Sequence, residues 1–409
     1  MKFNRNYKMS RKLIVASVFP PDAVTSAYLN IDLANALAKD GKVTVIRPFP
    51  SRPKGVTYTE KDIKQSANFE SVLVDSYRCP SSKLFGRFRE SISFGRACQR
   101  YIEEHHEEID FIYNHSWQLF GYNMVAKTAD RFGIPYMVVV QDIYPESLFT
   151  SRNLPGIIKL VITKILGGID KYTLKHAARV RTISEEMRCY LIKTRGLDKN
   201  KVFAVDNWQD DSNHFYKPLD VDKKKFVFEY VGSINSHSNV DLIIRAFAKA
   251  QLSDAELRIY GGGNKKEECV QLVKDLGLNN VRFDYVQREN VPQVQAEASV
   301  LVLALSKGNG AFSLPSKVTS YMLSGRPILA SVDVESATTR YINNAGCGIA
   351  VPPADEDALA QAFKNLYSMK QDELASMGMR AREFADKHLT RDYNLNIVVD
   401  QIKEILKNG

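Results

Sequence analysis

The 409-residue chain has few cysteines and no long apolar run, and these absences exclude several classes of protein. Its five cysteines show no CxxC spacing or cysteine–histidine pairing, so we expect neither a zinc site nor a disulfide framework. This cysteine usage favours a protein of the reducing cytosol. No stretch of about 18 apolar residues occurs, so no membrane-spanning helix is expected. The basic N-terminus leads into a short apolar segment before Pro20, too short for a signal peptide.

The composition is that of a globular protein that attracts anions. Hydrophobic residues make up 44% and charged residues 25% of the chain, and the net charge is +9. Nucleotides, anionic lipid surfaces and nucleic acid are all compatible with this charge. No recognised nucleic-acid motif occurs, so nucleic acid is not an expected partner.

Strand and helix signals alternate in two blocks, which is typical of parallel sheets covered by helices on both faces. The length also exceeds that of one hydrophobic core. We therefore predict an N-terminal Rossmann-like domain, a linker, a second Rossmann-like domain, and a C-terminal helix that packs back on the first domain. Their bounds are residues 1–212, 213–225, 226–390 and 391–409.

The predicted elements are short apolar strands followed by helices. In the first block we expect strands at residues 13–18, 43–47, 111–113, 136–140 and 180–183, and helices at 27–38, 121–132 and 185–194. In the second we expect strands at residues 226–231, 257–260, 281–283, 300–305, 327–331 and 348–351, and helices at 240–250 and ending at 276.

Three loops, which begin at Gly232, Gly261 and Gly308, follow strands of the second block and should meet at the edge where such sheets bind ligands. After the third loop, Pro315 opens a predicted helix with Lys317 in its first turn. A cation is unfavourable at the positive end of the helix dipole, and a bound phosphate would resolve that conflict. A solvated lysine on an ordinary strand–loop–helix unit is the alternative.

Several stretches, taken in order along the chain, resemble the retaining glycosyltransferases of family 4, and most closely the WbuB-like subgroup. They are Phe19-Pro-Pro-Asp22, Gln141-Asp-Ile-Tyr-Pro-Glu-Ser-Leu148, Asp206-Asn-Trp208, Tyr230-Val-Gly-Ser233, Pro315-Ser-Lys317, Ser324-Gly-Arg-Pro327 and Ala345-Gly-Cys-Gly-Ile349. The resemblance implies the GT-B fold, an α/β architecture of two doubly wound Rossmann-like domains that face a cleft. It covers nearly the whole chain.

The resemblance implies a hexosyltransferase of bacterial capsule, O-antigen or exopolysaccharide synthesis. A nucleotide sugar, expected to be UDP-linked, would be the donor in the second domain. A saccharide, free or on polyprenyl diphosphate, would be the acceptor on the first. No metal and no cofactor are implied, and Asp220-Val-Asp222 is interpreted as a solvated loop.

The chain departs from the family in the donor region. Phe312 and Ser320 stand where the wider family has two glutamates, one for the sugar and one for the ribose. Asn235, Ser236 and His237 stand where the family has a basic pair for the diphosphate. These departures leave the donor open.

The candidate donor-binding residues follow from the loops and the resemblance. Lys317, Ser316 and the backbone at Gly232 and Ser233 are assigned to the diphosphate. A plain tight turn is the alternative for Gly232, and a solvated helix face for Lys265 and Lys266. The full donor set is Gly232, Ser233, Gly261, Arg288, Ser316, Lys317 and Ser320.

The catalytic candidates lie in the first domain. His115 follows a strand where the family often has a histidine against the donor sugar, and a hydrogen-bonded structural histidine is the alternative. Asp142 or Glu146 would orient or deprotonate the acceptor hydroxyl. Glu146 is equally interpreted as an acid that stabilises a helix start. Asp22, with the same ambiguity, and Ser26 are assigned to the acceptor side.

Two cationic segments with apolar residues suggest a peripheral position on the inner face of the cytoplasmic membrane. The segment from Leu154 to Lys175 has an apolar arc and a lysine arc, and the segment from Lys83 to Arg100 carries arginines among apolar residues. A core helix with a solvated lysine face is the alternative. Two alternative functions also stay open: a nucleotide-sugar epimerase of the same fold, and a non-catalytic nucleotide-sugar-binding protein.

Overall fold

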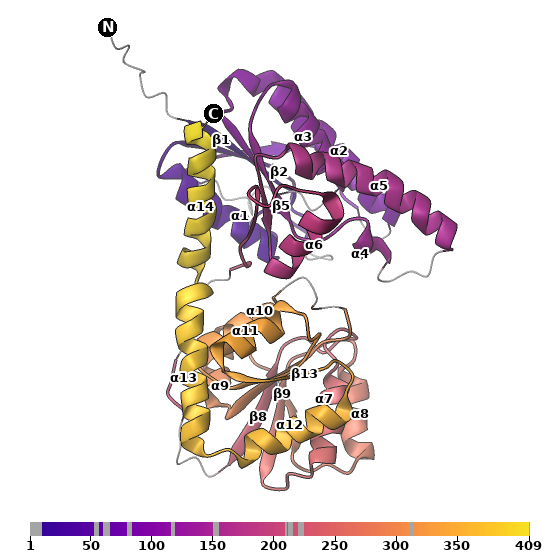
Figure 1. The fold of residues 1–409 in the computed structure, drawn as a ribbon, viewed down its shortest axis with the longest axis vertical. Coiled ribbons are helices and arrows are strands. Elements are labelled where there is room, and N and C mark those ends of the chain that lie inside the picture. The colour runs from indigo at the N-terminus through magenta and orange to yellow at the C-terminus, as the bar shows by residue number, and fades with distance from the viewer. Residues whose placement is uncertain are drawn as a thin grey trace. The chain divides into compact units, whose positions relative to one another are not determined.

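The computed structural model describes residues 10–52, 57–59, 66–79, 84–115, 119–149, 155–208, 211, 216–219, 225–308, 310 and 314–408, without the side chains of residues 84, 148, 149 and 288. The chain divides into two compact units (Figure 1). The first comprises Met1–Ile183, Met187–Val205 and Leu395–Gly409, and the second comprises Ser184–Glu186 and Asp206–Asn394.

A parallel sheet forms the centre of the first unit, in the order β3-β2-β1-β4-β5-β6-β7. The strands are β1 (Arg11–Ala16), β2 (Lys42–Pro48), β3 (Glu70–Val74), β4 (Phe111–His115), β5 (Tyr136–Val140), β6 (Arg179–Thr182) and β7 (Val202–Ala204). The central strands β4 and β5 are buried along their whole length, as expected for a parallel sheet with both faces covered.

Helices α2, α3 and α5 of the first unit pack side by side (Figure 1). The C-terminal helix α14 is joined to this unit by an ion pair from Lys403 to Asp40 at 2.7 Å and a hydrogen bond from Arg179 to Gln401 at 3.0 Å. The helices are α1 (Thr25–Ala38), α2 (Leu84–His105), the 3-10 helix η2 (His106–Glu108), α3 (Leu119–Arg131), α4 (Glu146–Phe149), α5 (Gly156–His176), α6 (Glu185–Arg195) and α14 (Arg391–Asn408).

The second unit is built on another parallel sheet, in the order β10-β9-β8-β11-β12-β13. Its strands are β8 (Phe226–Val231), β9 (Ala255–Tyr260), β10 (Val281–Asp284), β11 (Val300–Ala304), β12 (Ile328–Ser331) and β13 (Gly348–Val351). Its helices are α7 (Val240–Ala250), α8 (Lys266–Asp275), the 3-10 helix η3 (Arg288–Asn290), α9 (Val291–Glu297), α10 (Ser316–Leu323), α11 (Ala337–Ala345), α12 (Glu356–Ser368) and α13 (Gln371–His388).

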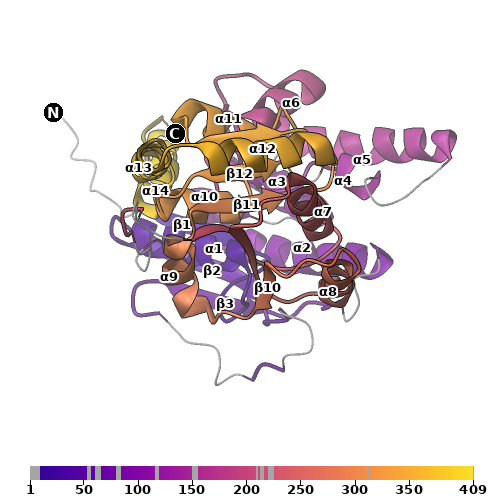
Figure 2. The ribbon, with the colours of Figure 1, turned by 90° about the horizontal axis from the view of Figure 1, so that it is seen from below.

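Two hydrophobic clusters lie on the opposite faces of the second sheet. One joins the sheet to α7, α8 and α12, and the other joins it to α10, α11 and α13 (Figures 1 and 2). The strand β8 contributes Phe226, Phe228 and Tyr230 to the first cluster and Val231 to the second, because successive side chains of a strand point to opposite faces.

The predicted class of two doubly wound Rossmann-like domains is confirmed. The bounds of β5, β8, α7 and β13 agree with the sequence prediction, whereas β3, β7 and the long α2 were not predicted. β3 is partly exposed along its length, and β7 has only three residues, so neither has a buried apolar run. Among the described residues, no helix is both long and apolar enough to cross a membrane.

Candidate functional site

Two loops at the carboxyl edge of the second sheet contact each other backbone to backbone. The amide of Gly232 donates to the carbonyl of Tyr260 at 2.8 Å, and the amide of Ile234 donates to the carbonyl of Gly262 at 2.8 Å. A Cβ on Gly261, whose φ is +147°, would lie 1.9 Å from the carbonyl oxygen of Gly232. Gly261 is therefore needed for the close approach of these loops, and it fixes the position of Gly232.

Lys317 lies in the first turn of α10 and its side chain extends over Gly232. Its Nζ donates a hydrogen bond to the hydroxyl of Tyr230 and lies 4.2 Å from the centre of the Tyr230 ring. A Cβ on Gly232 would lie 2.1 Å from Cε of Lys317, so the lysine occupies the space that a side chain would take. Burial lowers the pKa of Lys317 to about 8. The structure thus brings the predicted Gly232 and Lys317 together.

The other predicted diphosphate residues surround this contact. Ser233 follows Gly232 with an exposed side chain, and its backbone carbonyl accepts a hydrogen bond from Tyr230 at 2.6 Å. Ser316 is exposed at the start of α10, one residue later than the predicted helix start. Pro315 is the N-cap, and its side chain cannot accept a hydrogen bond from the first turn. The backbone amides of this turn suit an anion.

Ser320 is a donor candidate further along α10. Ser320 donates to the side-chain oxygen of Gln295 in α9 at 2.7 Å, and Ser324 donates to the same oxygen at 2.8 Å. Ser320 therefore links α10 to α9. Phe312 and the side chain of Arg288 lie outside the described residues.

A groove of about 590 Å³ between α7 and α8 reaches the loop that begins at Gly232. Asn235 and Ser236 are among its lining residues, and they stand where the family has its basic pair. Lys265, at the groove, is ion-paired with Glu268 at 2.6 Å, which agrees with its interpretation as part of a solvated helix face.

His115 ends β4 and is buried in the first unit. Its Nδ1 lies 2.5 Å from the side-chain oxygen of Asn30, and its Nε2 lies 3.1 Å from the side-chain nitrogen of Gln141. Burial, with a smaller effect of the Arg181 charge, lowers its pKa to about 3. The ring is therefore neutral, and these partners fit a proton on Nδ1, donated to Asn30. This geometry matches the structural alternative for His115, which links α1, β4 and the loop after β5.

Asp22 is also buried and bonded to backbone amides. One carboxylate oxygen accepts from the amides of Ser51 and Arg52 at 2.8 and 2.7 Å, and the other accepts from Phe19 at 3.2 Å. Asp22 thus fixes the loops that follow β1 and β2. Ser26, in the first turn of α1, is half-buried.

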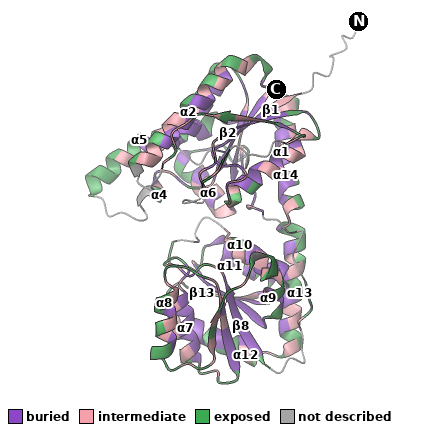
Figure 3. Ribbon diagram, turned by 180° about the vertical axis from the view of Figure 1, so that it is seen from behind, coloured by how far each residue is buried: buried purple, intermediate pink, exposed green. Residues whose placement is uncertain are grey.

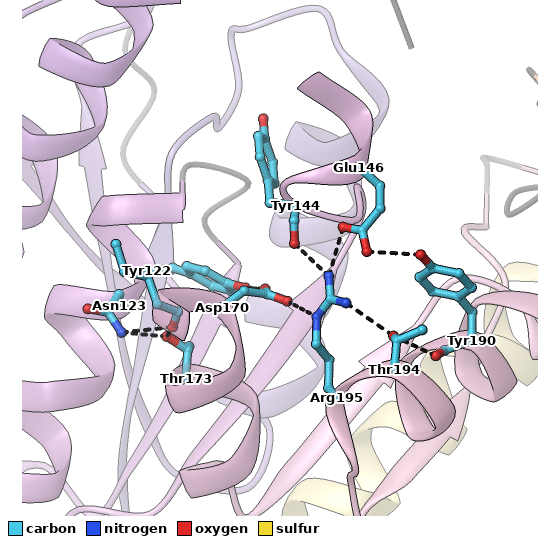
Figure 4. A network of polar contacts seen from close by, with 10 residues as sticks. Tyr122, Asn123, Tyr144, Glu146, Asp170, Thr173, Tyr190, Thr194 and Arg195 are labelled. Carbon is cyan, nitrogen blue, oxygen red and sulfur yellow. Dashed lines mark hydrogen bonds and ion pairs between the residues drawn. The ribbon is translucent and has the colours of Figure 1, made fainter. Parts of the chain in front are cut away.

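Glu146 belongs to a polar network around Arg195, which is 7% exposed (Figure 4). The guanidinium of Arg195 donates to Glu146 and Asp170, each at 2.8 Å, and to the carbonyl of Tyr144 at 2.7 Å. Glu146 also accepts from Tyr190 at 2.9 Å. These hydrogen bonds outweigh desolvation and lower the pKa of Glu146, which makes it a weaker base. The network gives Glu146 a structural role.

Asp142 follows β5 and is more exposed than Glu146. The residue is exposed, yet desolvation of its carboxylate raises its pKa, while the nearby Arg87 has the opposite, smaller effect. A carboxylate that is accessible, and more basic than usual, can accept a proton from a hydroxyl group.

Comparisons with known proteins agree with this architecture. The family described as Glycosyltransferase Family 4 matches residues 27–212, and the family described as Glycosyl transferases group 1 matches residues 211–384. The probable glycosyltransferase WbjE of Pseudomonas aeruginosa is 24% identical over 292 residues, which are 68% of this chain and 70% of that protein.

Two solved structures share the fold at low sequence identity. Alr3699/HepE of Anabaena, in complex with UDP and glucose, has a TM-score of 0.67 and 15% identity, over 98% of this chain and 100% of that one. WaaG, a glycosyltransferase involved in lipopolysaccharide biosynthesis, has a TM-score of 0.62 and 13% identity. The match covers 95% of this chain and 98% of WaaG. The structure has the GT-B fold, and the family matches support a glycosyltransferase. The Glycosyltransferase Family 4 match lies in the first half of the chain and the Glycosyl transferases group 1 match in the second half.

Sequence reasoning missed the partners that hold the candidate residues. The sequence predicts no role for Tyr230, Gln295, Asn30 or Arg195, although Tyr230 belongs to one of the motifs of the resemblance. A signal existed for Tyr230 alone, since a tyrosine at the end of an apolar strand needs a partner for its hydroxyl. The partners of Asn30 and Arg195 lie far away in the sequence.

Proposed function

We propose that this protein transfers a sugar, with retention, from a UDP-sugar to a saccharide or a polyprenyl-diphosphate-linked acceptor. The product would be a bacterial capsule, O-antigen or exopolysaccharide. The observation that carries the proposal is the half-buried Lys317 ammonium, held over Gly232 at the start of α10. The UDP bound to Alr3699/HepE and the lipopolysaccharide role of WaaG support the donor and the pathway class.

The chemistry requires charge stabilisation on the donor and orientation of the acceptor. The bond between the anomeric carbon and the diphosphate oxygen breaks, and the acceptor oxygen bonds to that carbon and loses its proton. Lys317 and the amides at the start of α10 would stabilise the departing diphosphate. Asp142 would orient the acceptor hydroxyl and accept its proton. In this proposal the protein's own cation, without a metal ion or cofactor, supplies the positive charge.

The first half of α5 supports a membrane-borne acceptor. Ile157 is 80% exposed and Leu160 is 70% exposed, and Lys159 and Lys164 are exposed as well. Figure 3 shows this part of α5 mostly in the colour of exposed residues. The core-helix interpretation fits only the second half, which buries Leu166 and Leu174 among other residues. An apolar helix surface with interspersed lysines suits an anionic bilayer. At the start of α2, Phe85 is 85% exposed and near Arg87 and Arg89 in sequence. Leu154 and Lys83 lie outside the described residues.

The donor is tested with a panel of nucleotide sugars. A UDP-sugar that binds the folded protein raises its melting temperature, by an amount that grows with the logarithm of its concentration. The same sugar should then be transferred to a lipid-diphosphate acceptor with its anomeric configuration kept. Interconversion of UDP-N-acetylhexosamines without transfer would support the epimerase instead, and binding without turnover would support the non-catalytic protein.

Membrane binding is tested by sedimentation with anionic phosphatidylglycerol vesicles. Replacing Lys159 and Lys164 with glutamine, or Leu160 with aspartate, should leave the protein in the supernatant. Val334→Asp is the matched control, because Val334 is an exposed apolar residue of the second unit. Equal sedimentation of all variants would contradict the membrane proposal.

A further inference from the structure

Tyr230 contacts both groups that are assigned to the donor diphosphate. Its hydroxyl donates to the backbone carbonyl of Ser233 at 2.6 Å and accepts a hydrogen bond from Nζ of Lys317. The ring centre lies 4.2 Å from the same Nζ, within the range of a cation–π interaction. Tyr230 itself is fully buried, so its ring and hydroxyl are held in place by the surrounding core.

The path of the Lys317 side chain explains why this contact requires Gly232. α10 packs on one face of the second sheet, in the cluster that includes Val318 and Met322. Tyr230 belongs to the cluster on the opposite face. Lys317 therefore reaches across the carboxyl end of β8, through the space where a Cβ of Gly232 would lie. The lysine needs an anchor on the far side, and Tyr230 is that anchor.

The neighbours of Tyr230 show that packing alone does not require its hydroxyl. Phe226 and Phe228 precede it on the same face of β8, and they pack against each other and against aromatic rings of α7 and α12. A third phenylalanine would continue that apolar row. The tyrosine adds only a hydroxyl group, at the end of the strand nearest the loop.

We infer that Tyr230 is a positioning residue for the donor diphosphate. Its hydroxyl holds the Lys317 ammonium at a fixed place relative to the Gly232–Ser233 backbone, so that cation and amides face the same anion. This inference rests on the proposed function, because it assumes that a diphosphate binds there. Preorganisation of this kind increases affinity, since a long flexible side chain loses less freedom on binding.

The test is a double-mutant cycle of Tyr230→Phe and Lys317→Met, with UDP affinity measured by calorimetry and donor KM and kcat measured separately. Tyr230→Phe should weaken UDP binding and raise the donor KM about tenfold in the wild-type background, as expected for losing a hydrogen bond to a charged group. In the Lys317→Met background the same change should have no effect on affinity, because the group it positions is absent.

Tyr321→Phe is the control, because Tyr321 is another buried tyrosine of the second unit, whose hydroxyl accepts from the amide of Val231 at 3.0 Å. This variant should lower the melting temperature while changing UDP affinity less than Tyr230→Phe does. If Tyr230→Phe melts too early to assay, Gly232→Ala disturbs the same contact from the lysine's side and should raise the donor KM likewise.

The possible outcomes separate the two proposals. A wild-type protein that binds no UDP-sugar overturns the proposed function and this inference with it. Wild-type binding that Tyr230→Phe leaves unchanged, or makes tighter, overturns only the inference. An equal loss of affinity in the Lys317→Met background also overturns it, because the effect would then be general destabilisation.

Discussion

Gly232→Ala should impair both stability and donor binding, for two separate reasons. At φ +150° a side chain strains the backbone, and such strain costs about 1–3 kcal/mol. In a unit of this size that corresponds to a melting temperature lower by roughly 3–10 °C. The new Cβ would also lie 2.1 Å from Cε and 2.5 Å from Nζ of Lys317, so the flexible lysine must move away.

Displacing the lysine removes its charge from the diphosphate. A hydrogen bond to a charged group contributes about 1.5–3 kcal/mol, so UDP binding should weaken roughly 10- to 100-fold. Calorimetric titration with UDP, on protein kept well below its melting temperature, measures this loss apart from stability.

Gly262→Ala is the matched control in the facing loop. A Cβ on Gly262 would meet no heavy atom within 4 Å, and its φ lies outside the left-handed range. This variant should keep both the melting temperature and the UDP affinity of the wild type. If Gly232→Ala behaves like Gly262→Ala, the geometric reasoning about Lys317 is refuted.

Three further predictions concern charged groups of the two units. UDP affinity should vary little between about pH 7 and pH 8, where the terminal phosphate of UDP, with a second pKa of about 6, stays ionised. Above about pH 8 it should fall up to tenfold per pH unit, because Lys317, with a pKa of about 8, must then regain a proton to bind while Tyr230 stays neutral. A profile that stays flat above about pH 8, or the same fall in Lys317→Met, would contradict this. Asp142→Asn should lower kcat by about 10²- to 10⁴-fold with little change in melting temperature. Glu146→Gln should instead destabilise the first unit by about 1–3 kcal/mol, since Arg195 loses a charged partner. The reverse pattern of kcat and melting temperature would contradict the assignment.

The sheet core could be predicted from the sequence because its signals are local. β8 and α7 are an apolar run followed, after Gly232, by an apolar pattern of helical period, so both were predicted with their observed bounds. The helix α2 was missed because charged and polar residues are spread along it, and much of its apolar surface is covered by α3. Its helical character is decided by packing, which the local pattern does not contain.

The candidate site was predictable in part for the same reason. Lys317 was found because a lysine in the first turn of a helix, two residues after a proline, is a local oddity. Its partner Tyr230 lies 87 residues earlier, and Glu146 meets Arg195 across 49 residues of sequence. Such contacts depend on how elements pack, so the partners of Glu146, Asp22 and His115 became visible only in the fold.

The central claim, that Lys317 is a diphosphate ligand, is tested most directly by the affinity of Lys317→Met for UDP at fixed pH and low salt. Lys265→Met is the control, because Lys265 is a lysine near the same sheet edge that is ion-paired with Glu268. Our account predicts that Lys317→Met weakens UDP binding about 10- to 100-fold while Lys265→Met leaves it unchanged. Equal affinities of wild type and Lys317→Met would contradict the account.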